Sequence, residues 1–233
     1  MHVFFILMMT FVWSSPPKLK PFGYINIEVP EPSDIAVNPL KENSYFVVSD
    51  DGYLFEMSGE GKITRKADFY GNDCEGVHAD SNYVYVVEEF TRKIRVFDIH
   101  TFALERTLVF PYSGGRNKGY ESLTYNPVRK VFVMLTEKDP IYLLELDDDL
   151  RLINEHYLEG IAGDISAATF YDNHIWLLSD EDMHVIKLNP QTYKEVGRWY
   201  IPVINPEGIC FDNGQMLIVS DDMERLYRFP IPQ

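Results

Sequence analysis

A unit of about 43 residues repeats five times from residue 33 to the end of the chain. Each unit opens with a short segment, here called the head, and continues with short apolar runs rich in Val, Ile, Tyr and Phe. Turn pairs such as Asn38-Pro39 and Asn213-Gly214 separate the runs. The heads read SDIAVNP at 33, EGVHAD at 75, ESLTYNP at 121, SAATFYD at 166 and EGICFD at 207. Four strands in a repeat of this length are typical of a β-propeller blade.

The fifth unit ends in RLYRFPIPQ and lacks the fourth strand that the other units have. A strand-like segment, residues 23–29 (GYINIEV), precedes the first head and can supply it. The sequence therefore predicts an all-β fold, a five-bladed β-propeller with four-stranded antiparallel blades whose last blade is closed by the N-terminal strand. Closure of this kind leaves no open sheet edge between the first and last blades.

The chain before the repeats divides into two parts. Residues 3–13 are an apolar run followed by SSPPK. A run of this length is shorter than the roughly 20 residues that cross a bilayer, and it resembles the core of a secretory signal. We expect a signal peptide or a membrane anchor over residues 1–15, a linker over 16–22 and a single propeller domain over 23–233. The expected location is the periplasm or cell envelope, either free or attached to the membrane by the N-terminal segment.

The charge of the chain limits its partners. It has 21 Lys and Arg residues against 36 Asp and Glu residues, a formal net charge of −15. Such a protein repels nucleic acid phosphates and anionic lipid surfaces, so nucleic acid is not an expected partner, whereas cations are. The two cysteines, Cys74 and Cys210, are too few for a disulfide framework or a zinc site, and we expect them to pack as small apolar residues.

Three heads begin with a glutamate: Glu75, Glu121 and Glu207. In a propeller the first strand of each blade lines the central channel, so these side chains should meet at one channel mouth. Two like charges about 6 Å apart at an effective dielectric of about 20 repel by about 3 kcal/mol. Protonation, a basic partner or a bound cation must offset that repulsion. The heads contain no Lys or Arg, so we expect a cation with oxygen ligands, most simply Ca²⁺. Mg²⁺ is an alternative that requires stricter octahedral coordination. The other alternative is a structural scaffold without a metal, in which these carboxylates accept hydrogen bonds from neighbouring backbone N–H groups.

A second set of acids closes the second strand of every unit. They are Asp50, Glu89, Glu137, Asp180 and Asp221. For these residues a role in capping turns is the favoured interpretation, with the metal site as the alternative. Ser33 and Ser166 replace the head acid in two units, and Asp164, two residues before Ser166, can still reach the mouth. We expect Gly76, after Glu75, to let the chain turn into the innermost strand.

Motifs of known catalytic chemistry do not occur. The sequence has no G-x-S-x-G, no P-loop and no H-E-x-x-H. His78 follows Glu75 by three residues and is expected either to pack between blades or to carry protons. The second role belongs to the alternative function, a metal-dependent hydrolase of the lactonase or esterase propeller type, in which the cation polarises a carbonyl group.

Three heads and the strand ends that follow them resemble those of the SdiA-regulated family of bacterial envelope proteins. The heads are EGVHAD, ESLTYNP and EGICF, and the strand ends are VVEE, LTEKDP and IVSDD. The resemblance extends over residues 23–233. The individual motifs are also distantly similar to those of NHL-repeat propellers. It implies a five-bladed propeller behind an N-terminal export or membrane segment, with a calcium site near the channel. Carried over by position, the expected ligands are Glu75, Glu121 and Glu207. The expected function is a module that binds a small molecule or a protein at the channel face.

Overall fold

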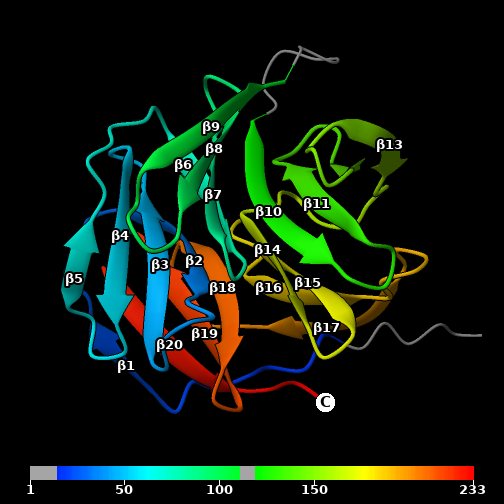
Figure 1. The fold of residues 1–233 in the computed structure, drawn as a ribbon. Coiled ribbons are helices and arrows are strands. Elements are labelled where there is room, and N and C mark those ends of the chain that lie inside the picture. Colours follow the sequence, from blue (N-terminus) through cyan, green and yellow to red (C-terminus); the bar gives the residue numbers. More distant parts are fainter. Residues whose placement is uncertain (1–14, 111–118) are drawn as a thin grey trace, which may run out of the picture.

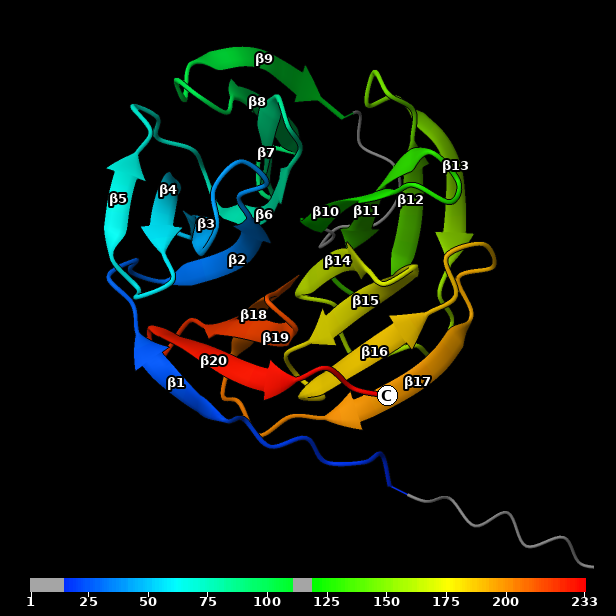
Figure 2. The same ribbon diagram turned by 60° about the horizontal axis from the view of Figure 1, so that its bottom comes forward.

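The computed structural model describes residues 15–110 and 119–233, and its regular elements are 20 β-strands in five four-stranded antiparallel sheets. The sheets are arranged as blades around a central axis (Figures 1 and 2). The predicted five-bladed propeller is therefore confirmed. Among the described residues no helix is long and apolar enough to cross a membrane. Except for Ser15, the predicted signal peptide or anchor lies outside the described residues.

The strands of each blade run outward from the channel in chain order, except that β1 is the outermost strand of the last blade. The innermost strands are β2 (Pro32–Val37), β6 (Cys74–Ala79), β10 (Tyr120–Asn126), β14 (Ala167–Tyr171) and β18 (Pro206–Asp212). The second strands are β3 (Ser44–Ser49), β7 (Tyr83–Glu88), β11 (Val131–Thr136), β15 (His174–Ser179) and β19 (Gln215–Ser220). The third strands are β4 (Tyr53–Ser58), β8 (Lys93–Asp98), β12 (Tyr142–Leu146), β16 (His184–Leu188) and β20 (Arg225–Pro230). The outermost strands are β5 (Ile63–Lys66), β9 (Leu104–Val109), β13 (Leu152–Tyr157), β17 (Glu195–Tyr200) and β1 (Gly23–Asn26).

The ring is closed by β1, which pairs antiparallel with β20 and completes the last blade (Figure 2). The pairing runs from Gly23 opposite Arg228 to Asn26 opposite Arg225. The predicted closure by the N-terminal strand is thus confirmed. Residues 16–22, predicted to be a linker, pass from the outer edge of the fourth blade to the fifth blade, where the Phe22 N–H donates to the Arg228 carbonyl at 2.7 Å. Residues 17–19 make the contacts with the fourth blade. There the Leu19 N–H donates to the Tyr200 carbonyl at 2.9 Å, and the Tyr200 N–H donates to Pro17 at the same distance.

The core consists of five apolar clusters, and each fills the space between two neighbouring blades. This follows from the strand pattern, because both faces of every blade pack on another blade and the central strands are apolar throughout. Trp176 on β15 is the bulkiest of the fully buried side chains, and it packs near Trp199 and Phe211 between the fourth and fifth blades. The two cysteines are free and buried in such clusters, as expected.

A β-bulge at the start of the innermost strand directs the head residue. In four blades the register between first and second strands shifts by one residue, and the residue left unpaired is the head residue itself. These residues are Ser33, Glu75, Glu121 and Glu207. A bulge removes one residue from the ladder and redirects its side chain. In this protein the redirected side chains reach the channel mouth.

The glycines after two of the head glutamates have a different role from the predicted one. Neither Gly76 nor Gly208 is among the described residues with positive φ, so neither supplies a turn. A Cβ atom at Gly76 would lie 2.9 Å from the Cα of Ser122, and one at Gly208 would lie 2.7 Å from the Cα of Asp34. Both glycines therefore allow the innermost strands of adjacent blades to approach closely around the channel.

Candidate functional site

The channel mouth is a small cavity of about 200 Å³ with a carboxylate lining. Of the ten described residues that line it, eight are acids and none is Lys or Arg. The acids are Asp50, Glu75, Glu89, Glu121, Glu137, Asp164, Asp180 and Glu207. The three head glutamates predicted to converge are therefore all present in one cavity. The bulges account for their positions, since each head lies at the start of an innermost strand.

Two groups of three carboxylates within the described chain are close enough to share a metal ion. In each group the oxygen atoms lie within 4.8 Å of one another. One group is Asp73, Glu75 and Glu89, and the other is Glu89, Glu121 and Glu137. Glu89 belongs to both groups, so it joins them into one acidic surface. Glu207 belongs to neither group, although its charge acts on both Glu75 and Glu121.

The carboxylates of the mouth are hard to ionise together. Burial, followed by the charges of neighbouring acids, raises the pKa of Glu75 and of Glu121 well above the ordinary value. Burial and the charges of Asp180 and Asp50 raise the pKa of Glu207 to about 8. Near neutral pH the metal-free mouth therefore holds protons in place of some negative charges.

Glu89, the member common to both carboxylate groups, titrates close to neutral pH. Burial, together with hydrogen bonding to Asp73 and the Asp73 charge, raises the pKa of Glu89 to about 7. At the rim, Lys138 forms ion pairs with Glu137 at 2.6 Å and with Glu181 at 3.2 Å. Lys138 therefore neutralises part of the negative charge at the rim and leaves most of the eight acids of the mouth without a basic partner of this kind.

The acids after the second strands lie in the mouth more often than the sequence indicated. Turn capping was the favoured interpretation, yet four of the five line the cavity with the head glutamates. The first residue after each second strand lies at the same end of the propeller as the heads. Their acidic character in all five units was the signal that could have identified them. Asp221, the fifth, raises the pKa of Glu207 through its charge.

Serine replaces the head glutamate in two blades, and each of these blades still contributes a carboxylate. In the first blade the Ser33 hydroxyl donates to Asp50. In the fourth blade Asp164 lines the mouth, as expected, and accepts a hydrogen bond from the Ser179 hydroxyl at 2.6 Å. The Ser166 hydroxyl instead donates to the Pro206 carbonyl at 2.8 Å and ties the fourth blade to the fifth.

His78 does not belong to the acidic mouth. It lies three residues beyond Glu75 on β6, about 10 Å farther along the strand, and lines a second cavity at the other end of the channel. There its ring stacks on Tyr85, with ring centroids 5.8 Å apart. A proton carrier for a metal at the mouth must reach that metal, and His78 does not. Of the two proton carriers of the hydrolase alternative, a glutamate or His78, only the glutamates lie in the mouth.

A buried carboxylate, Asp34, separates the two cavities. Its oxygens accept hydrogen bonds from the N–H groups of Ile35 at 2.7 Å and Val77 at 2.8 Å, and the N–H of Ile209 also donates to it. These three N–H groups belong to the first, second and fifth blades. Burial raises the pKa of Asp34 well above its ordinary value, against the effect of the three donors. Asp34 thus links the innermost strands at mid-channel.

The fold and the mouth together define a class of protein, a five-bladed β-propeller with an acidic entrance to its channel. Comparison with protein families agrees with the predicted resemblance. The sequence model of the SdiA-regulated family matches residues 26–230, and the chain belongs to this family. A search of curated proteins finds no significant sequence match.

Solved structures show the same architecture at low sequence identity. Glutaminyl cyclase from Myxococcus xanthus is similar with a TM-score of 0.74 and 16% identity, over 92% of this chain and 97% of the cyclase chain. The β-propeller domain of Myceliophteria thermophila Cps50 (Swd1) is similar with a TM-score of 0.52 and 10% identity, over 85% and 65% of the two chains. Identities this low establish the shared fold alone.

Proposed function

We propose that the protein is an envelope-associated propeller that binds a calcium ion at the acidic channel mouth and serves as a ligand- or partner-binding module. The observation that carries this proposal is the mouth lining, in which eight of ten residues are acids and none is basic. Calcium takes six to eight oxygen ligands in flexible geometry, which suits carboxylates contributed by separate blades. The proposed ligands are Glu75, Glu121 and Glu207, and Glu89 is close enough to share an ion with Glu75 or with Glu121.

The electrostatics of the mouth supports a cation. The raised pKa values of Glu75 and Glu121 show how unfavourable their ionised forms are in the metal-free protein. A divalent cation reverses that balance, because it pairs with several carboxylates at once and displaces their protons. The two three-carboxylate groups joined by Glu89 supply more oxygen atoms than one calcium ion needs.

Thermal unfolding in chelator and in Ca²⁺ tests the proposal. At a calcium concentration 100 times the dissociation constant, the folded state should gain about 2.7 kcal/mol. Glu121→Gln should reduce this gain, because Glu121 is buried and adjoins Glu75, Glu89 and Glu137. Glu155→Gln is the matched control, since Glu155 is exposed on β13. If Ca²⁺ produces no shift and elemental analysis finds no metal, the calcium site is refuted.

Location is tested separately from metal binding. The apolar run over residues 3–13 supports export, with the propeller outside the cytoplasm. Fractionation of cells that express the full chain should place it in the envelope, whereas a chain without residues 1–15 should stay in the cytoplasm. Equal cytoplasmic recovery of both chains would refute the location.

A further inference from the structure

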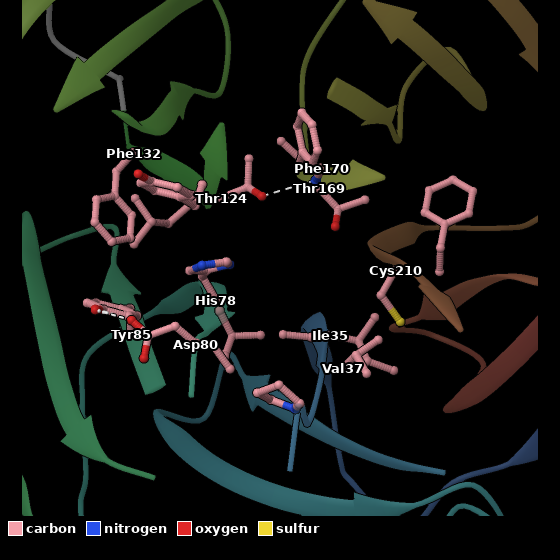
Figure 3. Close-up of a pocket in the computed structure, with 18 of the residues that line it drawn as sticks. Ile35, Val37, His78, Asp80, Tyr85, Thr124, Phe132, Thr169, Phe170 and Cys210 are labelled. Atoms are coloured by element: carbon pink, nitrogen blue, oxygen red, sulfur yellow. Dashed lines mark hydrogen bonds between the residues drawn. The ribbon is translucent and has the colours of Figure 1, made fainter. Parts of the chain in front are cut away.

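The far end of the channel, opposite the acidic mouth, holds a cavity of about 670 Å³ (Figure 3). It is formed where the innermost strands end, and all five blades contribute residues to its lining. Cavities of roughly 300–1,000 Å³ are the size that proteins use for small molecules. Asp34 and its hydrogen bonds lie between this cavity, here called the apolar pocket, and the mouth.

The walls of the apolar pocket are mostly aliphatic and aromatic. On one side the rings of Tyr85 and Phe132 lie 5.2 Å apart, and Tyr125 packs edge-on against Phe132 at 5.1 Å. Phe170 lies across the pocket from Tyr85, and Ile35 forms another part of the wall (Figure 3). A molecule with an aromatic or aliphatic body would gain free energy by leaving water for this surface.

A few polar side chains on this apolar surface keep donors or acceptors that no described residue uses. His78 projects into the pocket (Figure 3), and no described residue forms a hydrogen bond with either of its ring nitrogens. Burial lowers the pKa of His78 to about 4, against the nearby charge of Asp80, so its ring is neutral at pH 7. A neutral imidazole offers one donor and one acceptor.

Two threonines add hydroxyl groups beside His78. Thr124 Oγ1 accepts the Phe170 N–H at 3.1 Å, which leaves its own O–H available as a donor (Figure 3). Thr169 lines the same wall, and within the described chain its hydroxyl makes no hydrogen bond. Donors and acceptors therefore converge on one region of an otherwise apolar cavity.

The charges around the apolar pocket discriminate between ligands. Its described lining contains Asp80 and Asp148 but neither Lys nor Arg. Asp80 already accepts hydrogen bonds from the Tyr85 hydroxyl at 2.7 Å and from the N–H groups of Asn82 and Tyr83. An anionic ligand would lose its hydration and face these carboxylates without a compensating cation.

We propose that the apolar pocket binds an uncharged small molecule with an aromatic or aliphatic body and a hydrogen-bonding group such as an amide. The body would lie against Tyr85, Phe132 and Phe170. The amide would bond to His78 and the threonine hydroxyls. This inference rests on the ligand-binding part of the proposed function and specifies its ligand class, and it does not depend on the cation at the mouth.

A matched pair of probes tests the inference. Binding of 1-naphthaleneacetamide and 1-naphthaleneacetate to the purified protein is measured at pH 7.5 by isothermal titration calorimetry. The two probes share one body and differ in charge. The neutral amide should bind saturably and at least tenfold more tightly than the anion. Equal affinities, tighter binding of the acetate, or no saturable binding of the amide would overturn the proposal.

Variants locate the binding site. His78→Phe keeps a ring against Tyr85 but removes the imidazole nitrogens, so it should weaken the amide at least fivefold and leave unsubstituted naphthalene unaffected. The matched control is His174→Phe, since His174 lies outside the pocket and its Nδ1 is bonded to the Asp172 carbonyl at 2.7 Å. Thr169→Trp should fill the pocket and abolish binding of all three probes. Unchanged amide binding in His78→Phe, or in a folded Thr169→Trp protein, overturns the assignment.

The same titrations separate this inference from the calcium proposal. The amide should bind equally in chelator and in Ca²⁺. Amide binding without calcium stabilisation would refute the cation site alone. Calcium stabilisation without amide binding would refute the apolar pocket alone.

Discussion

Replacing Glu207 by glutamine should stabilise the metal-free protein at alkaline pH, contrary to the usual effect of changing a buried residue. Burial and neighbouring acids raise the pKa of Glu207 from 4.5 to about 8. Between these two pH values the unfolded chain loses this proton before the folded chain does. The contribution of Glu207 to the free energy of unfolding therefore falls as the pH rises from about 4.5 to 8. Glutamine has nearly the same shape as glutamate but does not ionise, so the variant does not lose this part of its free energy of unfolding.

The size of the effect follows from the pKa shift. One pKa unit corresponds to about 1.36 kcal/mol, so the rise from 4.5 to about 8 amounts to about 5 kcal/mol at high pH. At pH 8, where the folded carboxyl is half protonated, the loss is about 4 kcal/mol. The Glu207 side chain keeps some contact with water, which screens its charge, and we expect about half of that value. A gain of about 2 kcal/mol corresponds to about 4–8 °C in melting temperature for a chain of this length. At pH 5 the gain should be below about 1 kcal/mol, because the folded carboxyl is already protonated.

Thermal melts in chelator at pH 5 and pH 8 measure the difference, with Glu155→Gln as the exposed control. A Glu207→Gln protein no more stable than the parent at pH 8 would refute the reasoning. A gain of equal size at both pH values would refute it too, because the cause would then be packing and not ionisation. With saturating Ca²⁺ the order should reverse if the proposed site is correct, since the variant has one ligand fewer.

Three further predictions concern the framework around the channel. Asp34→Ala leaves three backbone N–H groups without their acceptor and should cost about 3–6 kcal/mol in urea unfolding, whereas the exposed Asp149→Ala should change stability by less than about 1 kcal/mol. Cys74 and Cys210 are buried with raised pKa values, so a thiol reagent should label neither in the native protein and both in denaturant. Hydrogen bonds to Glu145, of which the one from Arg129 has the largest effect, lower its pKa to about 2 against the effect of burial. Glu145→Gln should therefore destabilise the protein at pH 7, but progressively less as the pH falls from 4.5 towards 2.

The fold could be predicted because its signals are local and repeated. Each blade carries its own apolar strands and turn residues, and five copies reinforce one interpretation. Even the closure by β1 followed from a local observation, the missing fourth strand of the last unit. The bulges were not predicted, because a register shift is a property of two paired strands. Yet those bulges direct Glu75, Glu121 and Glu207 into the mouth.

The site was predicted in part for the same reason. Repetition identified the head glutamates. Asp73 lies two residues before Glu75, the position that Asp164 has before Ser166, but it emerged as a candidate ligand only from its proximity to Glu89. The prediction that Gly76 supplies a turn was wrong. A glycine is required there because Ser122 on the next blade approaches closely, and that contact is not visible in the sequence of one blade. The apolar pocket had no sequence signal at all. Its walls come from five separate segments, and their aromatic residues have the same spacing as ordinary packing residues between blades.

The pairing of β1 with β20 also has a consequence for how the chain reaches its native state. Among the propeller strands β1 is synthesised first and β20 last, so their contact joins residues such as Asn26 and Arg225 from opposite ends of the domain. The fifth blade cannot be completed until the whole domain has been made, and contacts this distant in sequence slow folding. A circular permutant that places residues 23–29 after residue 233 would build that blade from contiguous sequence. It should fold faster than the natural order while keeping the same native ring.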